Sequence, residues 1–178
     1  MTVPRGTQPR VRLDAPTDVL ATIPFLVGYH PSDSIVVLGL TENRVTFAAR
    51  DDLPAVGETP AEDQVTYLVE VVLRQGCRRV LLVGYGDEER VTPMIEALRA
   101  AFDQQGAKVV DALRADGQRY WSYVCTNERC CSPQGTPYDT STSEVAVAWT
   151  LAGRVARRDR AEYEAQIRPV SGAAREAM

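Results

Sequence analysis

Apolar positions along the chain follow two spacings, one typical of amphipathic helices and one typical of strands. Repeats at intervals of three and four residues predict helices over residues 14–28, 59–76, 92–106, 141–156 and 159–167. Short apolar or alternating runs predict strands over residues 34–40, 44–50, 78–86, 107–115 and 118–125. Helices and strands therefore interleave, which is typical of an α/β domain.

The connections between these segments predict the topology of the sheet. The pairs 42–43 and 116–117 leave room only for tight turns, so each joins two strands as a hairpin. The run 78–86 is apolar throughout, as in a strand covered on both faces of a parallel sheet. With the helix and strand that follow, it should form one right-handed crossover. We therefore expect an α/β fold with a mixed sheet of about five strands, built from two hairpins and one right-handed crossover and flanked by helices.

Several residues mark where the helices should begin or bend. Residues 59–62 and 141–144 match the capping-box pattern of a helix start. Thr92 followed by Pro93 predicts the start of the helix between the two parallel strands. Pro24 lies within the first predicted helix and should kink it.

The two ends of the chain differ in composition from its middle. Residues 1–10 combine proline, glycine and arginine without apolar periodicity, which predicts a flexible leader. Residues 11–169 should form a single α/β domain. Residues 170–178 resemble the beginning of a further helix, so we interpret them as a tail that starts a missing C-terminal region.

Charge and hydropathy narrow the classes of partner. The chain has 20 basic and 24 acidic residues and a net charge of -4, whereas proteins that bind nucleic acid generically carry a basic surface. No apolar run approaches the roughly 18 residues of a membrane span, and the N-terminus lacks the apolar core of a signal peptide. We expect a cytoplasmic protein without membrane association, for which nucleic acid is a disfavoured partner and a small ligand or a protein is favoured.

A glycine-rich turn follows the most apolar predicted strand. Gly84, Gly86 and Asp87 lie at its carboxyl end, where open α/β sheets place ligand crevices. The turn lacks the lysine and the spacing of phosphate-binding loops, and acidic residues follow it. Two interpretations stay open: a flexible turn before the next helix, or a ligand site. We predict that the largest hollow of the protein includes one of these three residues.

Aromatic side chains are concentrated in the predicted strand 118–125. Arg119, Trp121 and Tyr123 share one face of that strand, and Tyr120 faces the other way. An aromatic strand with an arginine can stack a nucleobase, so Arg119 and Trp121 are candidates for ligand binding. The alternative is that these aromatic residues belong to the core of the sheet, where they are favoured.

His30 is the single histidine of the chain and precedes Asp33 and Ser34. These are the residue types of a catalytic triad, but triad members normally gather from separate elements. We therefore interpret the segment as a turn. In that turn, Asp33 or Ser34 should accept a hydrogen bond from a nearby backbone amide.

Three of the four cysteines flank one long polar loop, which needs a local restraint in order to be ordered. We expect a disulfide between Cys125 and either Cys130 or Cys131 under oxidising conditions, and no cofactor. One alternative is a zinc site formed by these three thiolates, with His30 or Asp139 as the fourth ligand. The other alternative is a set of reduced thiols.

Three longer strings of the chain can be compared with known families. They are PFLVGYHPSDSIVVLGL at 24–40, RYWSYVC at 119–125 and CCSPQGTPYD at 130–139. In order and approximate spacing they resemble the actinobacterial domain-of-unknown-function family 4192. The resemblance implies an actinobacterial source, a cytoplasmic protein and an unassigned activity, and it supplies no catalytic residue.

No nucleophile, base and electrostatic stabiliser converge in the sequence. We therefore expect a noncatalytic regulatory or interaction module that binds a small ligand at the strand ends. The alternative is an enzyme acting on a nucleotide or other small metabolite, with Asp87 as its acid or base. Convergence of Asp87, His30, Arg119 and the cysteine loop in one cleft would favour the enzyme.

Overall fold

The computed structural model describes residues 13–42, 44–127, 130–141 and 143–168. The expected leader, 1–10, and the expected tail, 170–178, lie outside the described residues. The strands are β1 (Ser34–Thr41), β2 (Arg44–Asp52), β3 (Arg79–Tyr85), β4 (Lys108–Ala115), β5 (Arg119–Ser122) and β6 (Thr136–Pro137). The helices are α1 (Pro16–Val27), α2 (Glu62–Arg74), α3 (Glu88–Gln104), α4 (Glu144–Leu151) and α5 (Arg160–Ile167).

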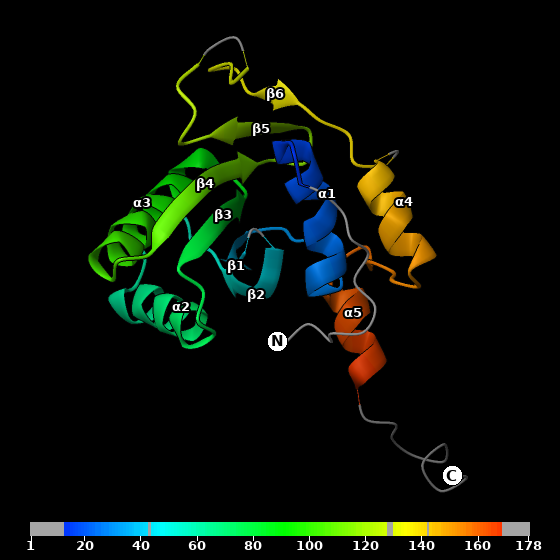
Figure 1. The fold of residues 1–178 in the computed structure, drawn as a ribbon, viewed down its shortest axis with the longest axis horizontal. Helices are drawn as coiled ribbons and strands as arrows, with labels where there is room; N and C mark the ends of the chain where they lie inside the picture. Colours follow the sequence, from blue (N-terminus) through cyan, green and yellow to red (C-terminus); the bar gives the residue numbers. More distant parts are fainter. Residues whose placement is uncertain (1–12, 43, 128–129, 142, 169–178) are drawn as a thin grey trace, which may run out of the picture.

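The strands form one mixed sheet in the order β2-β1-β3-β4-β5-β6 (Figure 1). β3 and β4 are parallel, and every other neighbouring pair is antiparallel. The two predicted hairpins are β1–β2 and β4–β5, and α3 connects the parallel pair. The α/β fold expected from the sequence is confirmed.

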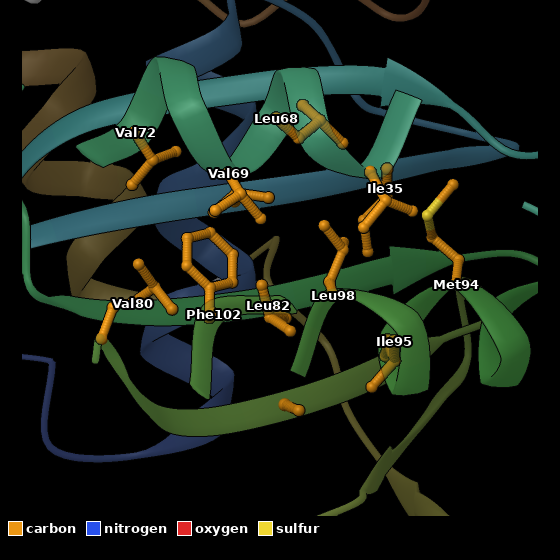
Figure 2. Close-up of a cluster of buried hydrophobic side chains, with 14 of the residues drawn as sticks. Ile35, Leu68, Val69, Val72, Val80, Leu82, Met94, Ile95, Leu98 and Phe102 are labelled. Atoms are coloured by element: carbon orange, nitrogen blue, oxygen red, sulfur yellow. The ribbon is translucent and has the colours of Figure 1, made fainter. Parts of the chain in front are cut away.

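One face of the sheet is covered by α2 and α3 (Figures 1 and 2). The buried positions of both helices recur at intervals of three and four residues, so each helix presents a continuous apolar stripe to the strands. Burying a large apolar side chain stabilises the fold by about 1.5–3 kcal/mol. The side chains that meet in this core include Ile35, Leu68, Val69, Val72, Val80, Leu82, Met94, Ile95, Leu98 and Phe102.

The opposite face is covered by α1. Val19, Leu20 and Ile23 pack against strand residues in a second core cluster. α4 packs against the outer side of α1, where the rings of Phe25 and Trp149 stack with centroids 6.0 Å apart and planes within 5°. The central strands are therefore enclosed on both faces, which explains why the sequence of β3 is apolar almost throughout.

α3 begins at Glu88, so the prediction that Thr92 and Pro93 open this helix is wrong. Gly86, with a φ of 143°, makes a tight exit from β3 that leaves Asp87 at the N-cap. Acidic residues at the first turn stabilise a helix through its macrodipole. The segment interpreted as a turn before Thr92 is therefore the first turn of the helix itself.

Both predicted capping boxes lie slightly ahead of the observed helix starts. α2 begins at Glu62, and its N-cap residue Ala61 makes no side-chain cap. α4 begins at Glu144, where the hydroxyl of Ser143 accepts a hydrogen bond from the amide of Val145 at 3.2 Å. Ser143, two residues after Ser141, thus caps α4, because it occupies the N-cap position next to the first free amides of the helix.

The predicted strand 118–125 is shorter than expected, since β5 ends at Ser122. The chain then loops away and returns as the two-residue strand β6. β6 pairs antiparallel with β5 and adds a sixth strand to the sheet. A two-residue strand carries no alternation that a sequence pattern could show.

Candidate functional site

A cleft of about 470 Å³ lies at the carboxyl ends of β3 and β4. Segments that are distant in sequence form its walls: the end of α1, the turn before β1, the β4–β5 turn and the residues after β6. They are Leu20, Pro24, His30, Pro31, Ser32, Asp33, Tyr85, Gly86, Asp87, Ala115, Asp116, Gly117, Tyr138, Asp139 and Thr140. Open α/β sheets place their ligand sites in this position.

The parallel pairing of β3 and β4 fixes the floor of the cleft. Tyr85 and Ala115 are neighbours in the register of these strands, and the Gly86 amide donates to the Ala115 carbonyl at 3.1 Å. This hydrogen bond aligns the carboxyl ends of β3 and β4 with each other. Leu20 and Pro24 of α1 add apolar surface beside them.

Tyr85 is the most unusual residue of the floor. The residue is only 8% exposed, and its hydroxyl is buried without a hydrogen-bond partner. Burial, with a smaller contribution from nearby Tyr138, raises the pKa of this phenol well above its ordinary value. The hydroxyl is therefore neutral at physiological pH, and it is available both to donate and to accept a hydrogen bond.

Four carboxylates line the cleft, and the described residues of its lining include no lysine or arginine. Asp33 forms an ion pair with Arg90 of α3. Asp116 accepts hydrogen bonds from the amides of Gln118 and Arg119 at 2.8 and 2.7 Å. Burial alone would raise the pKa of Asp116, but these bonds outweigh it and lower the pKa.

The other two carboxylates lie at the exposed edge of the cleft. Asp139 accepts a hydrogen bond from the Ser141 amide at 2.8 Å, which lowers its pKa. Asp87 is the N-cap residue of α3, yet its side chain makes no capping hydrogen bond. The cleft therefore combines an apolar floor with an anionic rim.

His30 lies in the same lining as Asp33 and Asp87, so the structure brings the single histidine together with one predicted ligand candidate. Ser34 points elsewhere: its hydroxyl donates to the Ser32 carbonyl and accepts from Arg50 at 2.9 Å. The prediction that Asp33 or Ser34 accepts a backbone amide is wrong. Arg90 binds the first side chain, and the second is buried inside the sheet.

Gly84 does not line the cleft, although Gly86 and Asp87 do. A Cβ atom added at Gly84 would lie 2.3 Å from Cγ1 of Val91. Glycine is required there because α3 crosses the strand closely. This residue packs the helix against the sheet, and the sequence suggested no such role.

A groove of about 660 Å³, larger than the cleft, lies next to the C-terminal half of α3, at the other end of β4. The cleft that contains Gly86 and Asp87 is therefore smaller than this groove, contrary to the expectation that it would be the largest hollow. Residues before β1 and after β6 also line the cleft at the strand ends. The lining of the groove is Glu96, Arg99, Ala100, Asp103, Gly106, Ala107, Lys108 and Val109.

Arg119 and Trp121 also lie outside the lining of the cleft. Arg119 donates to the Gly135 carbonyl at 2.8 Å, and the indole N–H of Trp121 donates to the Pro133 carbonyl at 3.1 Å. Both side chains bind the backbone of the loop between β5 and β6. In the structure these two ligand candidates anchor a loop.

The side chains of Cys125, Cys130 and Cys131 converge in that loop, with all three sulfurs within 4.8 Å of one another. The Sγ atoms of Cys125 and Cys130 are 3.3 Å apart, whereas a disulfide requires about 2.05 Å. The expected disulfide is not formed, and all three thiols are free. His30 and Asp139, the expected fourth ligands, do not belong to this cluster.

The pKa values of Cys125 and Cys131 shift in opposite directions. Burial, then hydrogen bonding to the other two sulfurs, raises the pKa of Cys131 to about 12. The Cys131 hydrogen bond, followed by one from the Asn127 backbone, lowers the pKa of Cys125. Cys125 therefore loses its proton more readily than Cys131, and the thiolate is the form that reacts with electrophiles and metals.

Several of the lining residues were not placed at this cleft by the sequence analysis. Tyr85 ends the apolar strand, and Asp116 begins the hairpin turn of β4, so both positions follow from the topology of two parallel strands. Tyr138 and Asp139 follow β6. Because that strand has no sequence signal, their arrival at the cleft could not be predicted.

Comparison with known proteins supplies a family and no activity. Among the described residues, no helix is both long and apolar enough to span a membrane. A search of curated proteins found no match to this chain. The family model described as "Domain of unknown function (DUF4192)" matches residues 16–178. The chain accordingly belongs to the DUF4192 family.

Proposed function

We propose that this protein is a noncatalytic regulatory module that binds a small organic cation in the cleft at the ends of β3 and β4. The ligand class is an amine or guanidinium group on a short apolar body. The observation that carries the proposal is the buried, unpartnered hydroxyl of Tyr85 on the floor of a cleft with an anionic rim.

The unpaired hydroxyl of Tyr85 carries a free-energy cost that a bound ligand would offset. Leaving a buried polar group without a hydrogen bond costs about 1–3 kcal/mol. A ligand N–H or oxygen that reached the phenol would recover this free energy on binding. Such a group would also lie beside Leu20 and Pro24, which suits a ligand with an apolar portion.

The negative charge of the rim favours a positively charged ligand. Asp87, Asp116 and Asp139 line the cleft, and hydrogen bonds lower the pKa of the last two. Two unit charges 4 Å apart interact by about 1–4 kcal/mol in water and near a protein surface. A cation is therefore attracted, while a free phosphate or carboxylate is repelled.

The volume of the cleft limits the size of the ligand. At about 470 Å³ it falls in the range of about 300–1,000 Å³ typical of small-molecule sites. Agmatine, tyramine and spermidine are suitable probes because they combine one or more cationic groups with apolar carbons. Inorganic phosphate and adenosine monophosphate are the matched anionic probes.

Thermal unfolding of the full chain with each probe tests the proposal. A ligand present at 100 times its Kd stabilises the folded state by about 2.7 kcal/mol, which for this size raises Tm by about 5–10 °C. At least one cationic probe should produce such a rise, and neither anion should. A panel in which no cation raises Tm contradicts the proposal.

Matched variants locate the binding. Asp87→Asn removes one charge from the rim and should reduce the rise in Tm produced by the active amine. Asp63→Asn removes one charge from an exposed position on α2 and should leave that rise unchanged. Equal responses from the two variants would mean that the amine binds through general charge and not in the cleft.

The second candidate is an enzyme that acts on a nucleotide or other small metabolite. His30 and Asp87 both line the cleft, so a proton donor and acceptor are present in one place. Arg119 and the cysteines lie outside that lining, and a nucleotide would need a divalent cation to offset the carboxylates. Incubating each probe and magnesium nucleotides with the protein, followed by mass spectrometry, should return them unchanged. Turnover that His30→Ala abolishes would establish the enzyme instead.

A further inference from the structure

The three thiols of Cys125, Cys130 and Cys131 form a cluster that the cleft does not use. Their ligand atoms lie within 4.8 Å of one another, and the sulfurs of Cys125 and Cys130 are 3.3 Å apart. In a tetrahedral zinc site with Zn–S bonds of about 2.3 Å, neighbouring sulfurs are about 3.8 Å apart. This separation lies between the 3.3 Å of the Cys125–Cys130 pair and the 4.8 Å limit of the cluster, so small shifts of the side chains would place the three sulfurs at three corners of such a tetrahedron.

Backbone hydrogen bonds fix the positions of the three cysteines. The amides of Cys130 and Cys131 both donate to the Asn127 carbonyl, at 3.1 and 2.9 Å. The Cys125 amide donates to the hydroxyl of Ser122 at 2.9 Å, at the end of β5. These bonds hold the backbone of the three cysteines where their sulfurs come within 4.8 Å of one another.

The loop after the cysteines is also anchored to the sheet. Trp121 and Arg119 hold the backbone of Pro133 and Gly135, and the Thr136 hydroxyl donates to the Cys130 carbonyl at 3.3 Å. Restraints of this kind orient the ligands of a metal site.

From this geometry we infer that Cys125, Cys130 and Cys131 bind one zinc ion as thiolates. Each thiol loses its proton when its sulfur bonds to the metal, so binding releases protons to solvent. Among the described residues the cluster supplies three ligand atoms, and water or another oxygen or nitrogen donor takes the fourth position. Thiolate-rich tetrahedral sites favour zinc over the oxygen-preferring cations magnesium and calcium.

Cobalt substitution of the full chain is the direct test. Reduced, metal-free protein titrated with Co²⁺ should develop a thiolate-to-cobalt charge-transfer band and tetrahedral ligand-field bands. These should saturate at one ion per chain, and added Zn²⁺ should abolish them. Protein expressed with zinc should contain one zinc per chain by elemental analysis. Absence of the cobalt bands in the wild type overturns the proposal without reference to any variant.

Three variants assign the ligands. Cys125→Ser and Cys131→Ser should each weaken Co²⁺ binding by at least about 10-fold, with the charge-transfer band reduced. Cys77→Ala removes the one cysteine that is buried away from the loop and should bind as the wild type does. Circular dichroism verifies that each variant folds. Equal binding by all three variants contradicts the assignment, as does a Cys125–Cys130 disulfide that forms despite equimolar zinc.

The zinc site is independent of the cation cleft. No cysteine lines the cleft, so the response of Tm to amines should persist in Cys125→Ser. Failure of either proposal would leave the other standing.

Discussion

The Cζ atom of Arg114 lies 3.6 Å from the ring centre of Trp121. The two residues are partners across β4 and β5, and Arg114, only 8% exposed, also pairs with Glu88 at 3.3 Å. A guanidinium over an indole in a partly desolvated position is a favourable cation–π pair. Trp121 also reaches the loop with the cysteines, so this contact connects that loop to the central sheet.

Gly135→Ala should test this connection. A Cβ atom there would lie 2.5 Å from the Trp121 ring, and the φ of 78° disfavours any side chain. Gly76 has nearly the same φ, 76°, with no atom within 4 Å of an added Cβ. Both alanine variants suffer the backbone strain of about 1–2 kcal/mol. Gly135→Ala should lose about 1–3 kcal/mol more.

Urea denaturation of the two glycine variants measures the difference in free energy of unfolding. Because backbone strain is matched between them, the excess loss reports the displacement of Trp121. Equal losses would show that the indole moves aside at no cost and that the contact does not hold the loop.

Gly84→Ala should destabilise the protein by pushing α3 away from β3. The added methyl would overlap Val91, whose Cγ1 lies 2.3 Å from the Cβ position, and overpacking of this kind costs about 1–3 kcal/mol. Val91→Ala should create room for it. In a double-mutant cycle the combined variant should therefore lose at least about 1 kcal/mol less than the sum of the single losses. Additive losses would mean that Gly84 is needed for some reason other than this contact.

Tyr85→Phe should weaken binding of the amine without lowering the stability of the fold. It removes a buried hydroxyl that has no partner, so the free energy of unfolding at neutral pH should stay unchanged or rise by about 1–2 kcal/mol. The same variant should weaken binding of the active amine. Loss of stability at neutral pH would indicate that the hydroxyl has a partner in the folded protein, which would remove the basis of the proposed site.

The alkaline stability of this variant gives a second readout. Burial raises the pKa of Tyr85 in the folded protein, so the contribution of its neutral form is complete below the unfolded-state pKa of about 10 and declines as pH rises above it. Tyr123 and Tyr138 also have raised pKa values and remain in the variant. Stability should therefore fall less steeply above about pH 10 in Tyr85→Phe than in the wild type. Identical slopes would contradict burial of this phenol.

Local patterns predicted most of the fold. The Asp116–Gly117 hairpin and the apolar stripes of α2 and α3 are determined by residues close in sequence, and these elements are confirmed. The start of α3 was misplaced because Thr92 and Pro93 resemble a helix start. The acidic residues that favour the observed start precede them.

The candidate site could be predicted only in part. Gly86 and Asp87 were placed at the cleft because parallel strands bring their carboxyl ends to one edge. Tyr138 and Asp139 reach that edge through β6, a strand too short to show periodicity. Arg119 and Trp121 lie on the same face of β5, as predicted. The loop between β5 and β6 covers them through hydrogen bonds to Gly135 and Pro133, and the spacing of residues along the chain gives no sign of these contacts.

The most direct test of the cation cleft is backbone amide chemical-shift mapping of the isotope-labelled full chain titrated with agmatine and tyramine. The largest shifts should fall at Gly86, Asp87, Gly117 and Asp139, which line the cleft. Largest shifts at Ala100, Gly106 and Val109, in the groove beside α3, or no saturable shifts with either amine, would contradict the proposed function.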